Sequence, residues 1–494
     1  MDSIILPLVL SLLLCTLFYI LASNSRRSNG SIKLPPGPHP LPIIGNILQL
    51  GSNPHQSLAK LSKKYGPLMY LKLGSKDTIV VSSPEIAKEV LQKHDQSLSG
   101  RPSPIVVQPE EHHKFSVVWL PTGSQWRLLR KICKEHMFST QRLDSGQEQR
   151  EEKLQKMIDY VKECCDRGQV VDISDAAFTT SLDLISASLF STDFDADTSQ
   201  ELQGIVRALF NLAGTPNLAE FFPFLQRIDP QGLGRRSTVL VGKLRDKFED
   251  IIRKRLQSES GTSKGDLLEV LLEIHFRNES EFTQNDILHL LMDLFVAGTD
   301  TTATTVEWAM AELIHNPRKM SKLKDELNSL IGENTQIEEA DIARMPYLQA
   351  VVKETLRLHP VVPFLIPHKA MDSVEINGYI LPKDAEIMVN VWSIGRDHNI
   401  WFNPDMFEPE RFLERKIDFR GQDFELIPFG SGRRICPGLP LAYRMVHSMV
   451  ALLVINFDWK LDGGMKPEEM DMTERFELSL QRAVPLKLVP LRRK

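Results

Sequence analysis

One cysteine of this chain, Cys436, lies in a glycine-rich loop directly before an apolar stretch. The loop reads F-G-S-G-R-R-I-C-P-G over residues 429–438. The apolar residues 439–455 predict a helix whose positive N-terminal end faces the sulfur, and Arg433 and Arg434 add cationic charge. Both effects favour the thiolate over the thiol. We therefore predict that Cys436 binds a ligand as a thiolate; the alternative is a structural cysteine buried beside a turn.

A second group of polar residues interrupts a long apolar helix. Residues 284–316 have helical periodicity, Thr283 and Asp286 can form a capping box before them, and Pro317 ends the helix. The middle of this helix reads A-G-T-D-T-T over residues 297–302. Glycine and clustered threonine are poor choices for a helix interior, because threonine hydroxyls bond back to the preceding turn. The pattern predicts a local opening of the helix, either beside a bound cofactor or at a flexible hinge.

The residues of this opening have the chemistry to serve a cofactor. Gly298 lets a bound group come close to the backbone. Asp300 and Thr301 supply a carboxyl and a hydroxyl, which can deliver protons through water. These residues alone leave the cofactor and the hinge equally open; beside a cofactor, Asp300 and Thr301 would be the catalytic residues.

Two distant segments supply one carboxylate and two arginines. The stretch K-E-T-L-R-L-H-P over 353–360 places Glu354 and Arg357 three residues apart, on one face of a helix. The stretch P-E-R-F over 409–412 adds Arg411. Most such pairs are solvated and contribute little, but the flanking residues here are apolar. We predict a buried cluster with a structural role, in which the loss of one partner is severe.

The motifs F-x-x-G-x-R-x-C-x-G, A-G-x-D-T-T, E-x-x-R and W-x-x-x-R resemble those of the cytochrome P450 superfamily, and the resemblance covers nearly the whole chain. It implies haem b, with iron bound by the axial thiolate of Cys436, and proton delivery by Asp300 and Thr301. It also implies that the Glu354 cluster steadies the cysteine loop. The other residues that it places around the haem are Trp126, Arg130, His368, Phe429, Arg434, Ala297 and Gly298.

Three histidines are further candidates for contact with a ligand. His368 occupies a position that arginine often holds in this family, and a neutral histidine binds a haem propionate less firmly. His112 and His113 suggest a metal site, but adjacent side chains do not converge on one ion from a helix. We expect these two histidines to have a loop role.

Two short stretches, 228–232 and 425–430, resemble a plant terpenoid-oxidising branch that includes geraniol hydroxylases and the ferruginol synthases of abietane metabolism. This resemblance implies that one oxygen atom from O2 is inserted into a small lipophilic substrate, by hydroxylation of a diterpenoid or a monoterpenol. Two alternatives are an isomerase or dehydratase of the same fold that does not use O2, and a non-catalytic haem-binding protein. The pair Asp300 and Thr301 favours the monooxygenase.

Apolar residues from several segments are predicted to line the substrate pocket, as suits a lipophilic substrate. The segments are 105–107, 115–118, 205–212, 361–365 and 478–480. Within them we expect Val361, Val362, Phe364, Leu478 and Ser479 to contact the substrate. Ser479 and its neighbour Glu477 either orient a substrate hydroxyl or face water.

The electrons for this chemistry must come from another protein. The chain has no βαβ alternation and no phosphate-binding glycine motif, so NADPH and flavins are expected only on a separate NADPH-cytochrome P450 reductase. A basic run of Arg127, Arg130, Lys131 and Lys134 either docks an acidic reductase or is a solvated helix face. The net charge of −5, without a basic tract, argues against nucleic-acid binding.

The first residues predict a membrane anchor. The 19 residues 4–22 carry no charge and span a hydrocarbon core as a helix. Positive charges follow at Arg26, Arg27 and Lys33, which keeps the rest of the chain cytosolic. We predict a single-pass protein of the endoplasmic reticulum membrane. Its expected parts are an anchor at 1–24, a basic and proline-rich hinge at 25–42 and a haem-thiolate monooxygenase domain at 43–494.

The elements that must position these residues are mostly helices. Alternating residues at 68–73 and 78–81 predict a small early sheet, and helical periodicity dominates from Pro84 onward. Strand patterns return near 374–380, 386–391 and 476–488. We predict a mainly α fold with small β-sheets, the cytochrome P450 fold, preceded by one transmembrane helix.

Overall fold

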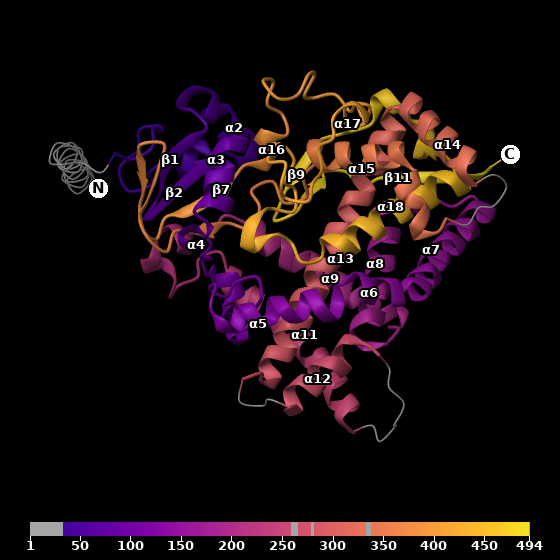
Figure 1. Cartoon of the computed structure of the whole chain (residues 1–494), viewed down its shortest axis with the longest axis horizontal. Helices are drawn as coiled ribbons and strands as arrows, with labels where there is room; N and C mark the ends of the chain where they lie inside the picture. The colour runs from indigo at the N-terminus through magenta and orange to yellow at the C-terminus, as the bar shows by residue number, and fades with distance from the viewer. Residues whose placement is uncertain (1–32, 258–264, 278–280, 332–336, 494) are drawn as a thin grey trace, which may run out of the picture.

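The structure is a computed structural model that describes residues 33–257, 265–277, 281–331 and 337–493. It is mainly helical with small sheets, as predicted (Figure 1). The helices are α2 (Pro54–Tyr65), α3 (Pro84–Lys88), α4 (Asp95–Leu98), α5 (Ser124–Ile132), α6 (Thr140–Ser145), α7 (Gln147–Arg167), α8 (Ile173–Phe190), α9 (Ala196–Gly214), α10 (Leu218–Phe221), α11 (Leu233–Gln257), α12 (Leu267–Arg277), α13 (Gln284–His315), α14 (Pro317–Ile331), α15 (Pro346–Leu358), α16 (Val391–Ile394), α17 (Arg411–Glu414) and α18 (Leu439–Asn456).

The strands form one four-stranded sheet and three smaller units. They are β1 (Leu68–Leu73), β2 (Lys76–Val81), β3 (Val171–Asp172), β4 (His368–Lys369), β5 (Val374–Ile376), β6 (Tyr379–Leu381), β7 (Glu386–Val389), β8 (Phe457–Leu461), β9 (Glu474–Phe476), β10 (Leu480–Arg482) and β11 (Lys487–Arg492). The largest sheet has the order β1-β2-β7-β4, with β2 and β7 parallel and the other pairs antiparallel. A second sheet has the order β3-β11-β8. Figure 1 shows the large sheet beside α2 and α3, and the long helices on the other side of the molecule.

Two of the predicted strands are hairpins. The segment 374–380 divides into β5 and β6, because Asn377 and Gly378 take positive φ values of 53° and 76° and reverse the chain. The segment 476–488 divides in the same way: β9 and β10 pair as a short hairpin, and β11 joins another sheet. The prediction found the extended residues but missed the turns between them.

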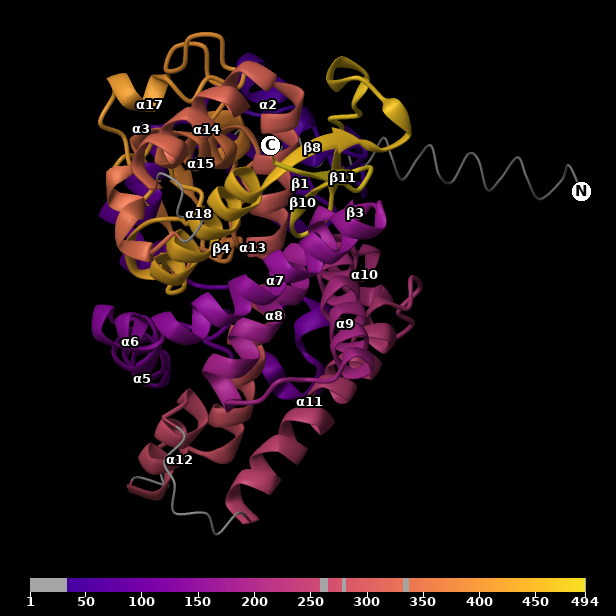
Figure 2. The ribbon, with the colours of Figure 1, turned by 90° about the vertical axis from the view of Figure 1, so that its right-hand side faces the viewer.

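Helix α13 positions the central motif. It begins at the predicted capping box, in which the Asp286 amide donates to Thr283 Oγ1 at 3.3 Å and the Thr283 amide donates to Asp286 Oδ2 at 2.8 Å. It packs against α8, α15 and α18 and runs through the centre of the helical body (Figures 1 and 2). The A-G-T-D-T-T motif therefore lies in the interior of the protein.

The apolar helix that follows the cysteine loop is α18. Among the described residues it is the one helix long and apolar enough to cross a membrane, and 67% of it is buried inside the protein. Burial of Met449 and Val450 at 0% exposure identifies α18 as a core helix. The predicted anchor, 1–24, and residues 25–32 of the predicted hinge lie outside the described residues.

Candidate functional site

A cavity of about 390 Å³ lies between α13 and the cysteine loop. Of the predicted haem-site residues, it is lined by Cys436, Phe429, Arg434, Trp126, Arg130, His368, Ala297, Gly298 and Thr301. Of the predicted substrate residues, it is lined by Val361, Val362 and Leu478. Most of the remaining wall is apolar and comes from α8, α9, α11 and the loop before α5. Residues spread over more than 300 positions of sequence therefore meet in one chamber.

The cysteine loop is shaped by its glycines. Gly430 and Gly432 take positive φ values of 74° and 66°. A Cβ on Gly432 would lie 1.9 Å from the carbonyl oxygen of Leu91, so only glycine fits there. The Cys436 amide donates to the carbonyl of Phe429 at 2.9 Å, which closes the loop. The sulfur is thereby held on the wall of the cavity.

Two opposing effects act on the sulfur. Burial raises the pKa of Cys436, while the backbone N–H groups of Gly438 and Leu439 and the charge of Arg130 lower it. The N-terminal end of α18 faces the sulfur, as predicted. The prediction for Arg433 was wrong: its guanidinium pairs with Asp95 at 2.9 Å on the surface. The 3-10 turn Gly432–Arg434 directs neighbouring arginines apart.

One end of the cavity carries buried positive charge. Arg434 donates from Nε to Ser99 at 3.0 Å and from Nη2 to Leu120 at 2.5 Å, but its buried Nη1 has no partner among the described residues. Arg434 and Arg130 both lie against Trp126, at 4.8 and 5.8 Å from the ring centre. Burial lowers the pKa of both arginines. Such a site suits an anionic group that supplies the missing acceptor.

A third arginine in this group, Arg101, was not predicted. It donates from Nε to the carbonyl of Val118 at 3.2 Å and from Nη1 to the carbonyls of Ile366 and Pro367. Burial, together with Arg434 and Arg130, lowers its pKa well below the ordinary value. No sequence motif marks Arg101, because its partners lie up to 266 residues away and are all backbone carbonyls.

His368 also lines this end of the cavity. It donates from Nδ1 to the carbonyl of Leu98 at 2.8 Å. Burial and the charge of Arg101 hold its pKa well below 6.5, so the ring is neutral. A carboxylate close to Nε2 would raise that pKa again. A propionate contact for His368 remains a prediction.

The two predicted proton-delivery residues point in different directions. Thr301 lines the cavity and donates from Oγ1 to the carbonyl of Ala297 at 2.8 Å. The predicted local opening of the helix was wrong: α13 is a continuous α-helix over these residues, because the threonine hydroxyls bond to carbonyls of the preceding turn without breaking it. Asp300 does not line the cavity. Its Oδ2 accepts a hydrogen bond from Ser479 Oγ at 2.8 Å, and its Oδ1 accepts one from Gln481 at 3.4 Å. Burial raises the pKa of Asp300, and the Ser479 hydrogen bond opposes that rise.

Two of the expected substrate residues do not lie on the wall. Ser479 is fully buried against Asp300, so its hydroxyl neither faces the cavity nor faces water. Phe364 packs in the core around Leu58 and Met69 and contacts Phe476 edge-on, with ring centres 5.9 Å apart. Both residues lie in turns or bends, where side chains do not follow the alternation of a strand. Sequence periodicity alone did not show which side faces the cavity.

The predicted loop role of His112 has a specific form. His112 Nε2 lies 3.1 Å from Asp293 Oδ1, and its Nδ1 lies 2.8 Å from His289 Nδ1. Asp293 also accepts hydrogen bonds from Ser116 Oγ at 2.9 Å and from the Val117 amide at 2.8 Å. The loop before α5 is thus fixed to α13 over the cavity. Among the described residues no His, Cys, Asp and Glu side chains gather as a metal site.

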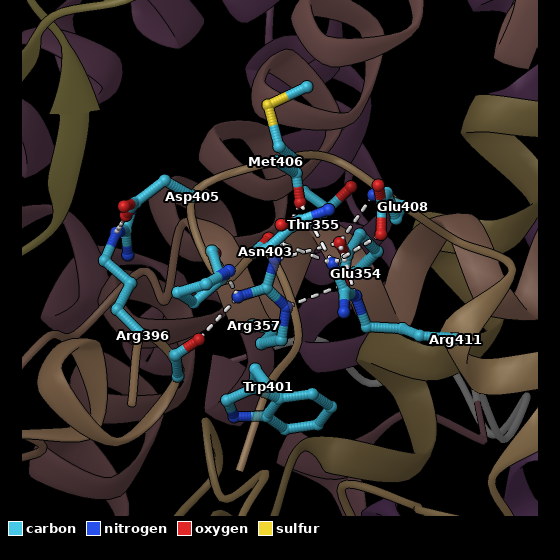
Figure 3. A network of polar contacts seen from close by, with 12 residues as sticks. Glu354, Thr355, Arg357, Arg396, Trp401, Asn403, Asp405, Met406, Glu408 and Arg411 are labelled. Carbon is cyan, nitrogen blue, oxygen red and sulfur yellow. Dashed lines mark hydrogen bonds and ion pairs between the residues drawn. The ribbon is translucent and has the colours of Figure 1, made fainter. Parts of the chain in front are cut away.

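The predicted Glu–Arg–Arg cluster is present and buried (Figure 3). Glu354 binds Arg357 Nε at 2.7 Å and Arg411 Nε at 3.0 Å. The side chains of Glu354 and Arg357 are 0% exposed. The two arginines also donate to backbone carbonyls of the segment between α16 and α17, which are those of Gly395, Phe402, Asn403, Pro404 and Met406. The cluster therefore ties α15 to that long irregular segment.

Buried neutral histidines make the fold sensitive to acid. Burial lowers the pKa of His447 from 6.5 to about 4, and its Nε2 has no partner among the described residues. The unfolded chain therefore binds the proton first, and stability is lost as the pH falls from 6.5 towards 4, by ~3 kcal/mol in total. We expect His447→Leu, which cannot titrate, to lose less unfolding free energy than the parent between pH 7 and pH 5. Urea unfolding at both pH values measures this, and equal losses would contradict it.

Comparison with known proteins assigns the class that this fold and site define. The family profile described as Cytochrome P450 matches residues 35–488. The chain belongs to the cytochrome P450 family, whose members bind haem through a cysteine thiolate and act as monooxygenases with electrons from NADPH by way of a reductase.

Three relatives show the branch of the family. Cytochrome P450 76T24 of Catharanthus roseus is 54% identical over 99% of both chains. Geraniol 8-hydroxylase of Catharanthus roseus is 49% identical, also over 99% of both chains. Ferruginol synthase of Isodon rubescens is 49% identical over 97% of this chain and 99% of its own. These sequence identities confirm the predicted resemblance to the terpenoid-oxidising branch.

Proposed function

We propose that this protein hydroxylates a lipophilic terpenoid, a diterpenoid or a monoterpenol, with O2 and with electrons from NADPH-cytochrome P450 reductase. The observation that carries the proposal is the shared chamber, in which Cys436 and Thr301 both line one largely apolar cavity. Relatives named ferruginol synthase and geraniol 8-hydroxylase support the substrate class. A carrier of haem would not need the hydroxyl on α13, and an isomerase that does not use O2 would not need proton delivery.

The residues present fit haem. Cys436 would hold the haem iron through its thiolate, which the N–H groups of Gly438 and Leu439 would stabilise. Arg130 and Arg434 form the cationic end that suits the propionates, with His368 and Trp126 beside them. Arg434 Nη1, buried without a described partner, is a donor that a propionate would satisfy. When bound, haem supplies the activation of O2.

Protons reach the reaction through α13. Thr301 Oγ1 lies on the cavity wall, where its hydroxyl orients water beside the reacting oxygen. Asp300 is buried with neutral hydrogen-bond partners, and burial raises its pKa, so its carboxyl binds a proton more readily than an exposed aspartate. In our proposal Asp300 takes up a proton outside the cavity and releases it to water at Thr301.

The substrate end of the cavity binds by shape and apolar contact. Its wall includes Val107, Leu209, Phe210, Val361 and Leu478. The hydroxyls of the other polar residues there, such as Thr302 and Ser181, donate to carbonyls of their own helices. An apolar carbon skeleton with few polar groups suits such a wall.

We infer the membrane location from the sequence before the described residues, and the redox partner from the charge of the surface. The uncharged residues 4–22, with the positive charges after them, support a single-pass anchor in the endoplasmic reticulum membrane and a cytosolic catalytic domain. Exposed Lys131 and Lys134, near the cysteine loop, offer a face for an acidic reductase. Membrane lipid and the reductase are thus the proposed partners.

Product analysis tests the substrate class. Membranes that contain the full chain and NADPH-cytochrome P450 reductase are supplied with NADPH and a panel of mono-, sesqui- and diterpenoids. We expect an added mass of one oxygen in a product from a mono- or diterpenoid, derived from labelled O2. A product formed without NADPH or O2 would favour the isomerase or dehydratase. No product from any panel member, with a normal carbon monoxide spectrum, would reject the terpenoid assignment.

Thr301→Ala tests the use of protons. Without the hydroxyl, water beside the reacting oxygen loses its orientation, so NADPH is consumed and hydrogen peroxide is released. We expect product formation to fall by roughly 10²-fold, the lower end of what positioned proton transfer contributes. The control is Thr304→Ala. Thr304 lies on the same helix and is buried, but it does not line the cavity, so this variant should keep NADPH consumption coupled to product formation. Full coupling in Thr301→Ala would remove the proposed role.

A further inference from the structure

A buried carboxylate outside the cavity holds several elements of the fold together. Glu474 lies at the start of β9, its side chain is 7% exposed, and it does not line the cavity. Its oxygens lie within hydrogen-bonding distance of side chains from three other parts of the chain, which are His55 at 3.0 Å, Gln56 at 3.3 Å, Trp392 at 3.1 Å and His359 at 3.3 Å. The Arg396 guanidinium lies 3.5 Å from the same carboxylate. We call these six residues the Glu474 cluster.

The carboxylate at the centre of this cluster is ionised. Burial raises the pKa of Glu474, but hydrogen bonds from His359 and His55 and the charge of Arg396 outweigh burial and lower the pKa well below 4.5. Breaking one contact of such a group leaves a buried charge or polar group without its partner, which is costly. The cluster therefore fixes the positions of the segments that meet in it.

The first of these segments leads directly into the cavity wall. His359 is the C-cap of α15, and Val361 and Val362, two and three residues further on, line the cavity. The His359 ring is also held from α13, because its Nε2 lies 2.7 Å from Glu312 and the ring stacks on Trp308 with ring centres 3.7 Å apart. The backbone that carries the two valines thus starts from a fixed point.

The second segment is the β9–β10 hairpin. Glu474 begins β9, and Leu478, in the turn of the hairpin, lines the cavity. The Leu480 amide, on β10, donates to the carbonyl of Val361 at 2.7 Å, and the Leu478 amide donates to the carbonyl of Phe210 at 3.4 Å. The segments that supply Val361 and Leu478 to the wall are therefore joined twice, by this backbone contact and by the Glu474 carboxylate.

We propose that Glu474 is a positioning residue that sets Val361 and Leu478 against the substrate and thereby decides which carbon is oxidised. It acts through His359 on one wall segment and through β9 on the other. An apolar skeleton offers few polar groups for orientation, so the shape of the wall decides which of its carbons lies nearest the reacting oxygen. The inference deepens the proposed function and rests on it, because it assumes that such a skeleton binds against this wall.

The ratio of products tests this role in the full-length protein with reductase, NADPH and a panel substrate. Glu474→Gln keeps the shape of the side chain but removes its charge and one acceptor oxygen. Since a misplacement of about 1 Å can cost roughly 10²-fold in rate, formation of the parent's main product should fall by up to that factor, and products oxidised at other carbons should form a larger share. Loss of folded protein would lower all products by one factor and leave their ratio unchanged. An unchanged ratio in Glu474→Gln would overturn the proposal.

Asp266→Asn is the matched control. Asp266 is 3% exposed and pairs with Arg255 at 2.7 Å, but neither residue lines the cavity. This variant also breaks a buried ion pair, yet it should keep the parent's product ratio; an equal change of ratio would overturn the role of Glu474. If Glu474→Gln does not fold, Trp392→Phe replaces it, because this change removes one N–H donor to the carboxylate and keeps an aromatic ring. It should change the ratio by a smaller factor, and an unchanged ratio would again overturn the proposal.

A second measurement does not need a terpenoid. The meta and para isomers of phenylpyridine bind haem iron through nitrogen and direct their phenyl groups against different parts of the wall. Their dissociation constants, read from the Soret band, should change by different factors in Glu474→Gln and by one common factor in Asp266→Asn. A common factor in Glu474→Gln would overturn the inference. Absence of product in the parent, together with different factors in Glu474→Gln, would reject the proposed function and support the positioning role.

Discussion

Replacement of Cys436 by serine should abolish hydroxylation and the carbon monoxide spectrum that is typical of sulfur-ligated haem. The sulfur lies on the cavity wall at the N-terminal end of α18, where Gly438 and Leu439 stabilise negative charge. Serine keeps the size of the side chain, but its hydroxyl does not ionise at neutral pH. We expect the loss of activity to exceed the roughly 10- to 100-fold that outer partners of a metal site typically contribute.

The control for this experiment is Cys133→Ala. Cys133 is buried and lies close enough to act on Arg130, but burial raises its pKa to about 12, so it stays a thiol. The reduced protein with carbon monoxide should show the sulfur-ligated band in Cys133→Ala and lose it in Cys436→Ser. If Cys436→Ser kept that band, the cysteine loop would not hold the iron and the proposed function would fail.

Features that depend on neighbours along the chain were predictable from the sequence. The capping box of Thr283 and Asp286 and the stop at Pro317 gave the bounds of α13 to within a residue, because a helix end is satisfied by groups next to it. The ion pair of Glu354 and Arg357 was predictable for the same reason, because residues three apart lie on one face of a helix. The spacing around Cys436 gave its place before α18.

Features that depend on tertiary packing were not predictable. Arg101 is held by carbonyls of two distant segments, so its sequence context carries no signal. Arg433 and Arg434 are equivalent in sequence, yet one pairs with Asp95 on the surface and the other lines the cavity. Ser479 was predicted to contact the substrate but turns towards Asp300 instead, because the packing of α13 directs Asp300 away from the cavity.

Neutralising Glu354 should cost more stability than any surface substitution. Glu354→Gln keeps the shape of the side chain but leaves Arg357 and Arg411 buried without their shared carboxylate. The Glu354 oxygen that binds Arg411 also accepts the Glu408 amide at 2.6 Å, so the same carboxylate also holds the segment before α17. Breaking a buried ion pair by removing one partner typically costs about 3–5 kcal/mol, a large share of the roughly 5–15 kcal/mol of a folded domain.

Glu273→Gln is the matched control for this prediction. Glu273 pairs with Arg277 at 3.4 Å on the surface of α12, where both side chains are mostly exposed, and such pairs contribute about 0–1 kcal/mol. Urea unfolding followed by tryptophan fluorescence should show a much lower midpoint for Glu354→Gln than for Glu273→Gln. Trp401 lies 5.4 Å from the Arg357 guanidinium and reports on the cluster directly (Figure 3). Equal midpoints would show that the segment from Gly395 to Arg411 keeps its fold without the charge of Glu354, and that the cluster is not what ties it to α15.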